Sequence, residues 1–129
     1  MNPILTTYFQ AVEVRLIHSP VILSYQRLRR EIGLIDGKIR YKLELIDNSL
    51  VECFAYVSEA SGQLQTLKYS FHWQDKTGKL MQRWDNAPHY PNLPNSPHHI
   101  HKHDGSIIQA KNDPDIMDFL DFLESELTQ

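Results

Sequence analysis

The stretch that decides the fold of this 129-residue chain is residues 36–57, which read DGKIRYKLELIDNSLVECFAYV. Apolar and charged side chains alternate over residues 39–45, as in a strand that is buried on one face. Residues 50–57 are richer in apolar side chains on both faces and predict a central strand. The pairs Asp36-Gly37 and Asp47-Asn48 are typical of tight turns. Together these residues predict neighbouring strands joined by hairpins.

The rest of the chain continues this pattern and adds a helix at each end. Apolar residues recur at helical spacing over residues 3–17 and 113–127, and both segments open with a capping residue and a proline. The sequence therefore predicts an α+β fold in one domain, residues 1–129, with an antiparallel meander sheet of about five strands flanked by an N-terminal and a C-terminal helix. The further strands are expected at residues 21–30, 64–73 and 80–84.

The composition is that of a soluble globular protein, with 41% hydrophobic and 22% charged residues. No apolar run approaches the ~20 residues of a membrane span, and no segment has the features of a secretory leader. A cytoplasmic protein without a membrane partner is therefore expected. The lone Cys53 agrees with this, since secreted small domains usually carry paired cysteines, and we expect it to be a buried structural residue.

The net charge of −3 hides an uneven distribution along the chain. Residues 113–126 contain six acidic residues and no Lys or Arg, which leaves ten acidic against thirteen basic residues in the rest of the chain. A mildly basic body is compatible with an RNA partner, although ordinary surface scatter explains so small an excess equally well.

Histidines are concentrated in residues 83–104, here called the histidine segment, which holds five of the seven histidines and four of the seven prolines. Each proline fixes its own backbone φ angle and favours extended geometry in the residue before it. A stiff, irregular loop is therefore expected, which is a suitable place to hold reactive side chains.

The side chains of this segment could make a metal-independent endoribonuclease. A histidine can accept the proton of a ribose 2′-hydroxyl, a second acid can protonate the departing 5′-oxygen, and a cation can stabilise the phosphate. The candidate catalytic residues are His72, Arg83, Asp85, Asn86, His89, His98, His99 and His101. The candidate substrate-binding residues are Lys68, Tyr69, Arg27 and Arg29.

The predicted strand at residues 64–73 imposes one restriction on this site. Lys68 and His72 lie on one face and Tyr69 on the other, so only one of these two sets can face a common cleft. No cofactor is expected, because the chain has no Gly-rich phosphate loop and no dinucleotide-binding pattern. Trp73 and Trp84 are expected in the core or at its rim rather than as stacking platforms for bases.

Three other interpretations remain open. His99, His101 and His103 alternate, so in an extended chain they could hold a transition metal together with His89 or Asp104, which would make a metal-binding hydrolase. A non-enzymatic module could capture RNA or a protein through the basic strand face. In the structural interpretation, the histidines are solvated or hydrogen-bond the turns around them.

Two runs of sequence carry a resemblance to a known family. These are Tyr69 to Asp75, and Arg83 to His101 with its Asp-Asn-Ala-Pro-His and Pro-His-His-x-His motifs. They resemble the TumE-type toxins of type II toxin-antitoxin systems, and the similarity extends over nearly the whole chain. The resemblance implies a small toxin that a cognate antitoxin protein neutralises by direct contact. The site residues and the endoribonuclease chemistry rest on residue chemistry and on the general habit of such toxins to attack RNA or translation, and homo-oligomer formation stays open.

Overall fold

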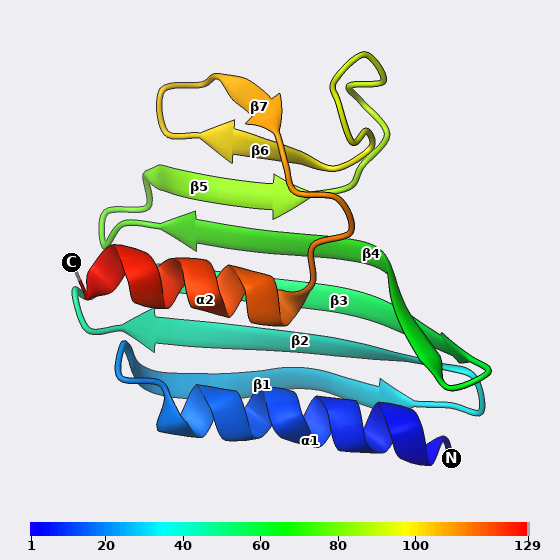
Figure 1. Ribbon diagram of the computed structural model, residues 1–129. Coiled ribbons are helices and arrows are strands. Elements are labelled where there is room, and N and C mark those ends of the chain that lie inside the picture. The colour runs from blue at the N-terminus through cyan, green and yellow to red at the C-terminus, as the bar shows by residue number, and fades with distance from the viewer. Residues whose placement is uncertain (129) are drawn as a thin grey trace.

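The computed structural model describes residues 1–128 as a single antiparallel sheet with two helices packed on one of its faces (Figure 1). The sheet has seven strands that lie side by side in chain order, each antiparallel to its neighbour. The elements in chain order are α1 (Pro3–His18), β1 (Ile22–Ile32), β2 (Asp36–Leu45), β3 (Leu50–Ala60), β4 (Gln63–Gln74), β5 (Leu80–Asp85), β6 (His99–Lys102), β7 (Ile107–Gln109) and α2 (Ile116–Leu127).

The predicted α+β meander is confirmed, but the expected number of about five strands was wrong. The two further strands are β6 and β7, and β6 lies inside the histidine segment. Their hairpin turns at residues 103–106, where Gly105 has a φ of +89° that glycine adopts without strain. The stiff irregular loop is therefore confined to residues 86–98, because the alternating residues after it pair with β5.

Both helices are capped at their N-termini by polar side chains. The Asn2 side chain accepts hydrogen bonds from the backbone N–H groups of Ile4 and Leu5, as the sequence predicts. The second helix begins later than expected, because Asp115 rather than Asp113 is its cap. Asp115 and Asp118 form a reciprocal capping box, which fixes the start at Ile116.

The hairpin between β1 and β2 turns before the Asp36-Gly37 pair, so the position predicted for this turn was wrong. The backbone N–H of Gly33 donates to the carbonyl of Asp36 at 2.8 Å, and Gly37 already pairs with Ile32 inside the sheet. A Cβ atom on Gly37 would lie 2.7 Å from the backbone oxygen of Glu31 on β1 and 2.8 Å from Cε2 of Phe9 on α1. The glycine is therefore required because the neighbouring strand and the helix both approach it closely, not because of the turn.

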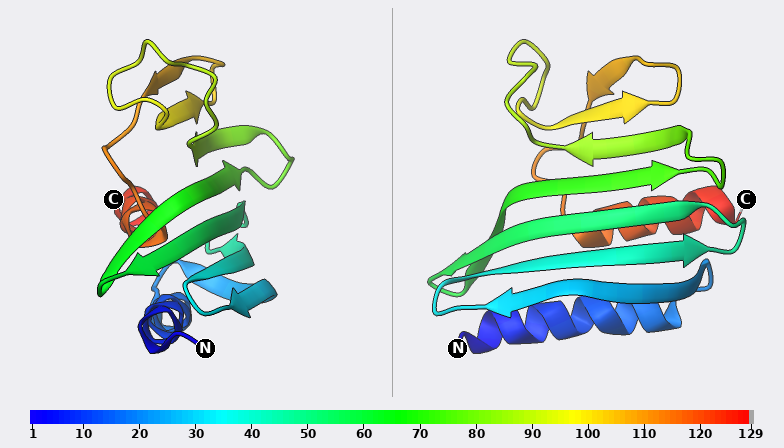
Figure 2. Two further views of the ribbon diagram at one scale, coloured as in Figure 1. Left: turned by 90° about the vertical axis from the view of Figure 1, so that its right-hand side faces the viewer. Right: turned by 180° about the vertical axis from the view of Figure 1, so that it is seen from behind.

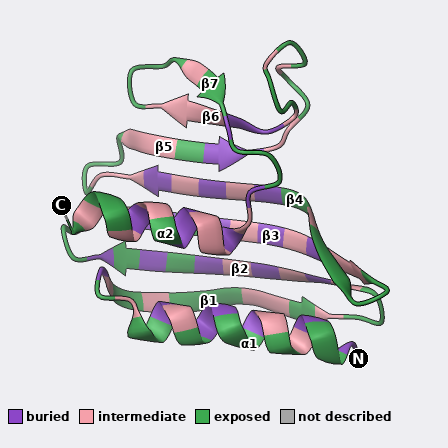
Figure 3. Ribbon diagram, viewed as in Figure 1, coloured by how far each residue is buried: buried purple, intermediate pink, exposed green. Residues whose placement is uncertain are grey.

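The two faces of the sheet differ in cover, as the two views of Figure 2 show. Helices α1 and α2 lie on one face, here called the helix face, and their apolar stripes bury its side chains. On the other face, here called the open face, no helix of residues 1–128 is packed. Burial consequently alternates along the central strands (Figure 3), and the helix-face core includes Tyr41, Cys53, Phe71, Trp73, Trp84 and Phe119.

Two expectations about individual core residues are confirmed. Cys53 is fully buried, and this burial raises the pKa of its thiol, so it stays protonated and unreactive. Trp73 and Trp84 pack against aromatic rings of α2 and are not available for stacking on bases. Neither helix within residues 1–128 is both long and apolar enough to cross a bilayer.

Candidate active site on the open face

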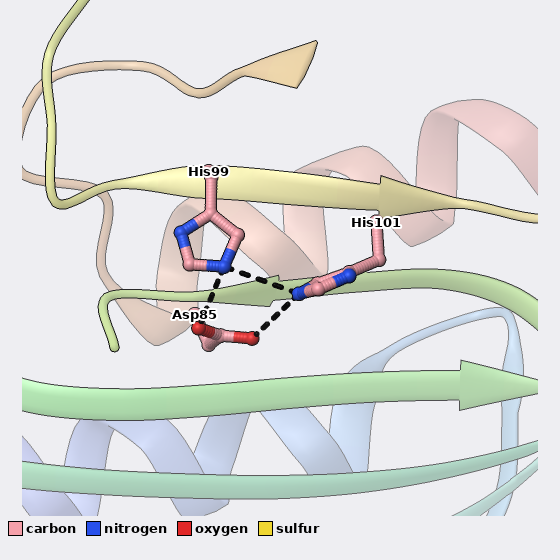
Figure 4. Close-up of side chains that lie close together, drawn as sticks. All are labelled: Asp85, His99 and His101. Atoms are coloured by element: carbon pink, nitrogen blue, oxygen red, sulfur yellow. Dashed lines mark hydrogen bonds and ion pairs between the residues drawn. The ribbon is translucent and has the colours of Figure 1, made fainter. Parts of the chain in front are cut away.

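One carboxylate and two imidazoles meet on the open face of the sheet (Figure 4). Asp85 Oδ1 lies 3.0 Å from Nε2 of His99, and Asp85 Oδ2 lies 3.3 Å from Nε2 of His101. The two histidine Nε2 atoms are 3.1 Å apart. These three residues are here called the open-face cluster.

Strand register brings these side chains together. Asp85 is the last residue of β5 and pairs with His99, the first residue of β6. Arg83 pairs in the same way with His101. Directly opposed residues in an antiparallel pair place their side chains on the same face, ~5 Å apart, so alternation along both strands directs all four side chains to the open face.

The loop of residues 86–98 covers much of this cluster. The ring of Tyr90 lies 4.8 Å from that of His99 and 6.1 Å from that of His101, in both cases edge to face. As a result His99 is fully buried and Asp85 is 4% exposed, although neither of the two described helices covers this side of the sheet. The accessible member of the cluster is His101, whose side chain is 27% exposed, and the side chain of Arg83 beside it is 45% exposed.

The electrostatics of the cluster favour a neutral His101. Burial lowers the pKa of His101, and the nearby His99 and Arg83 lower it further, while the Asp85 carboxylate opposes them only in part. The guanidinium of Arg83 donates from Nε to Oδ2 of Asp85 at 3.2 Å and so pairs with an ionised carboxylate. The backbone N–H of Ala87 also donates to this carboxylate, at 3.0 Å. The cluster therefore presents a neutral imidazole beside a permanent cation.

His98 belongs to a different environment, on the helix face. Its Nδ1 lies 2.9 Å from the hydroxyl oxygen of Tyr69, its ring stacks on the Tyr69 ring, and its Nε2 lies 3.3 Å from Asp113 Oδ1. One proton on Nε2 satisfies both contacts, as expected of a structural histidine. The eight candidate catalytic residues therefore do not form one site, because successive residues of an extended chain point to opposite faces.

Lys68 and His72 were expected on one face of β4 and Tyr69 on the other, and the structure shows which of them lie on the face of the cluster. Tyr69 is buried on the helix face, where burial raises the pKa of its hydroxyl. His72 pairs with Arg83 across β4 and β5, so both lie on the open face. His72, Arg83 and His101 form a row across three neighbouring strands. Lys68, which precedes His72 by four residues in β4, lies on the same face.

Asn86 and His89, the two remaining candidates from the histidine segment, have no place in the cluster. The Asn86 amide accepts from the backbone N–H of Tyr69 and donates to the carbonyl of Leu67, so it fastens the loop to β4. His89 is exposed in the loop. Both ends of the Asn86 amide are therefore engaged by the backbone of β4.

The two candidate arginines of β1 point to opposite faces. Both carboxylate oxygens of Glu13 on α1 accept from Arg27, at 2.7 and 2.8 Å, which holds this guanidinium on the helix face. Arg29 lies on the open face in an exposed ion pair with Glu31 at 2.8 Å. Of the two, only Arg29 lies on the same face as the cluster.

The structure changes the ligand set of the metal-binding alternative. Among residues 1–128, Asp85, His99 and His101 have ligand atoms that all lie within 4.8 Å of one another. His103 is instead exposed after β6, and the Asp104 carboxylate accepts hydrogen bonds from Ser106 in the following turn. The possible ligands expected from the sequence did not include Asp85, and Tyr90 was not expected at the site. The alternation of Arg83 and Asp85 in β5 was the available signal for Asp85.

Comparison with known proteins agrees with the resemblance found in the sequence. A family model described as Toxin TumE matches residues 12–127 of the 129-residue chain. The comparisons with curated proteins and with solved structures each found no match.

Proposed function

The chain belongs to the TumE toxin family, and from this premise we propose that it acts as the toxin of a toxin-antitoxin module by cleaving RNA at the open-face cluster. The observation that supports the proposal is the convergence of a carboxylate, two imidazoles and a guanidinium at one partly accessible edge of the sheet. Buried ionisable groups in close contact are characteristic of catalytic sites.

In the proposed reaction a ribose 2′-oxygen attacks the neighbouring phosphorus. The new 2′-O–P bond forms as the P–O5′ bond breaks, which gives a 2′,3′-cyclic phosphate and a 5′-hydroxyl. The reaction needs a proton acceptor for the 2′-hydroxyl, a proton donor for the 5′-oxygen and a cation for the crowded phosphate.

The row of side chains across β4, β5 and β6 matches these three needs. Arg83 lies between its neighbours and binds the phosphate, for which a permanently charged, forked guanidinium is well suited. On one side of Arg83, the open-face cluster accepts the proton of the 2′-hydroxyl. On the other side of Arg83, His72 protonates the leaving 5′-oxygen. With strands ~5 Å apart, donor and acceptor lie about 10 Å apart, so that a phosphate fits between them.

We further propose that the antitoxin neutralises the toxin by covering this accessible edge. Arg83 and Lys68 are exposed on the open face, and both described helices lie on the opposite face. A partner that contacts Arg83 would displace the phosphate directly. Cross-linking or protection from hydrogen exchange that places the antitoxin on the helix face instead would contradict this arrangement.

The test is cleavage of purified RNA by the purified protein and by the variant His101→Ala. His103→Ala is the matched control, since His103 is an exposed histidine two residues further along, outside the cluster. We expect wild type and control to give 2′,3′-cyclic phosphate ends and His101→Ala to lose at least about a hundredfold in rate. RNA that is bound but not cut by the wild type would favour a non-enzymatic binding module, and equal cleavage by all three proteins would exclude the open-face cluster.

A further inference from the structure

The tautomer of His99 is fixed by a backbone carbonyl. Nδ1 of His99 lies 2.8 Å from the oxygen of Pro97. A carbonyl oxygen only accepts hydrogen bonds, so Nδ1 must carry a proton. In the neutral ring, Nε2 then presents a lone pair towards Asp85 and His101. Metal-binding histidines commonly have this arrangement, with the outer nitrogen donating to a carbonyl and the inner nitrogen facing the ion.

No placement of protons makes all three contacts of the cluster attractive while Asp85 is ionised. A proton on Nε2 of His99 alone leaves the His101 lone pair facing the carboxylate at 3.3 Å. A proton on Nε2 of His101 alone leaves the His99 lone pair facing it at 3.0 Å. Protons on both make two N–H groups face each other at 3.1 Å. A cation between the three atoms would make every contact favourable.

We infer that the open-face cluster binds one divalent transition-metal ion, with Asp85, His99 and His101 as its ligands. Zinc bonds to imidazole nitrogen and carboxylate oxygen are ~2.0–2.2 Å long, so the ligand atoms of a tetrahedral site lie about 3.3–3.5 Å apart. The observed separations of 3.0, 3.1 and 3.3 Å are only a few tenths of an ångström shorter. The three side chains are therefore close to coordination geometry.

The chemistry of the ligands selects the class of metal. Two imidazoles favour Zn²⁺ and its neighbours over Mg²⁺ and Ca²⁺, which prefer oxygen ligands. Three protein ligands leave a position for water or substrate, as in catalytic zinc sites. One carboxylate does not neutralise a divalent ion beside Arg83, so the loaded site would attract an anion such as a phosphodiester.

The binding of the ion stands on geometry alone, whereas its catalytic consequence rests on the proposed function. A bound transition metal lowers the pKa of coordinated water and could thereby supply the proton acceptor of the RNA reaction. The metal-independent reaction expected from the sequence would then give way to a metal-assisted one. Metal binding is measured without RNA, so a failure of this inference can be told from a failure of the proposed function.

The test is titration of the metal-stripped protein with Co²⁺, followed by visible absorption, and elemental analysis after dialysis against Zn²⁺. We expect one bound ion per chain, with the intense absorption of a four- or five-coordinate Co²⁺ site. Asp85→Asn, which keeps the shape of the side chain, and His101→Ala should abolish saturable binding. The double variant His89→Ala/His103→Ala should bind like the wild type, since both of its histidines are exposed and outside the cluster.

A second readout guards against variants that fail to fold. Zn²⁺ should raise the melting temperature of the wild type and of the His89→Ala/His103→Ala control, and should leave folded His101→Ala unchanged. Absence of stoichiometric binding by the wild type would overturn the inference. So would binding that survives both Asp85→Asn and His101→Ala, or binding that the double variant loses.

Discussion

The variant Tyr69→Phe, which lacks one hydroxyl group, tests whether His98 and the open-face cluster are two independent environments. Tyr69 is 2% exposed and its hydroxyl donates to His98 Nδ1 at 2.9 Å on the helix face. Tyr69→Phe deletes this hydrogen bond and leaves the buried Nδ1 without a partner, while the stacked ring stays in place. Loss of a buried hydrogen bond with one orphaned partner costs about 1–2 kcal/mol. For a chain of this size that corresponds to a melting temperature lower by about 3–8 °C.

The RNA-cleaving activity of Tyr69→Phe should nevertheless stay within about twofold of wild type, because His98 lies on the face opposite the open-face cluster. Urea unfolding at pH 7 measures the first effect, and the cleavage rate at a temperature where both proteins are folded measures the second. Tyr25→Phe serves as control, as it removes a hydroxyl from a half-buried ring and should cost less than about 0.5 kcal/mol. A tenfold loss of activity in a fully folded Tyr69→Phe protein would refute the division into two environments.

Three further predictions concern the packing of α1 and the phosphate site. Burial raises the pKa of Glu13, but hydrogen bonds from Arg27 and neighbouring donors outweigh this effect and lower the pKa overall. Glu13→Gln should therefore lower the free energy of unfolding by about 1–2 kcal/mol at pH 7. The difference in stability between the wild type and Glu13→Gln should shrink as the pH falls below the usual carboxyl range, because Glu13 of the wild type then becomes protonated as well. Urea unfolding at pH 7 and at pH 3 measures this change. Gly37→Ala should destabilise by about 1–3 kcal/mol in thermal unfolding, since its Cβ would meet Phe9 at 2.8 Å. Arg83→Gln should lower kcat/KM for RNA about a hundredfold at a temperature where both proteins are folded, because the guanidinium proposed to bind the phosphate is lost. The melting temperature should also fall, because the buried Asp85 carboxylate loses its charged partner.

The parts of the fold that the sequence predicts are those with a strong local pattern. The Asn2 cap, both helices and β2 to β5 follow from periodicity and turn chemistry that act over a few residues. The β6 and β7 strands were missed because they are only four and three residues long, too short for alternation to stand out from the prolines before them. Gly37 was misplaced because its role depends on the close approach of the Glu31 backbone and of the Phe9 ring, which the turn pattern of the sequence does not reveal.

The sequence indicates which residues have suitable chemistry for the candidate site, but not which of them lie together. Asp85, His99, His101 and Arg83 were all named, since their chemistry is evident from the sequence. His98 and Tyr69 were grouped with them because sequence proximity says nothing about faces until β6 is known to be a strand. The burial of His99 depends on Tyr90, which reaches it from the loop, and on Pro97, whose carbonyl fixes its tautomer. Such contacts arise only from the three-dimensional path of residues 86–98.

Growth of cells that express the protein without its antitoxin, with total RNA profiled at arrest, tests most directly whether the open-face cluster is the active site of the toxin. We expect arrest with RNA cleavage for wild type and for His103→Ala, and neither effect for folded His101→Ala expressed at the same level. Arrest and cleavage by His101→Ala equal to those of the wild type would contradict this expectation.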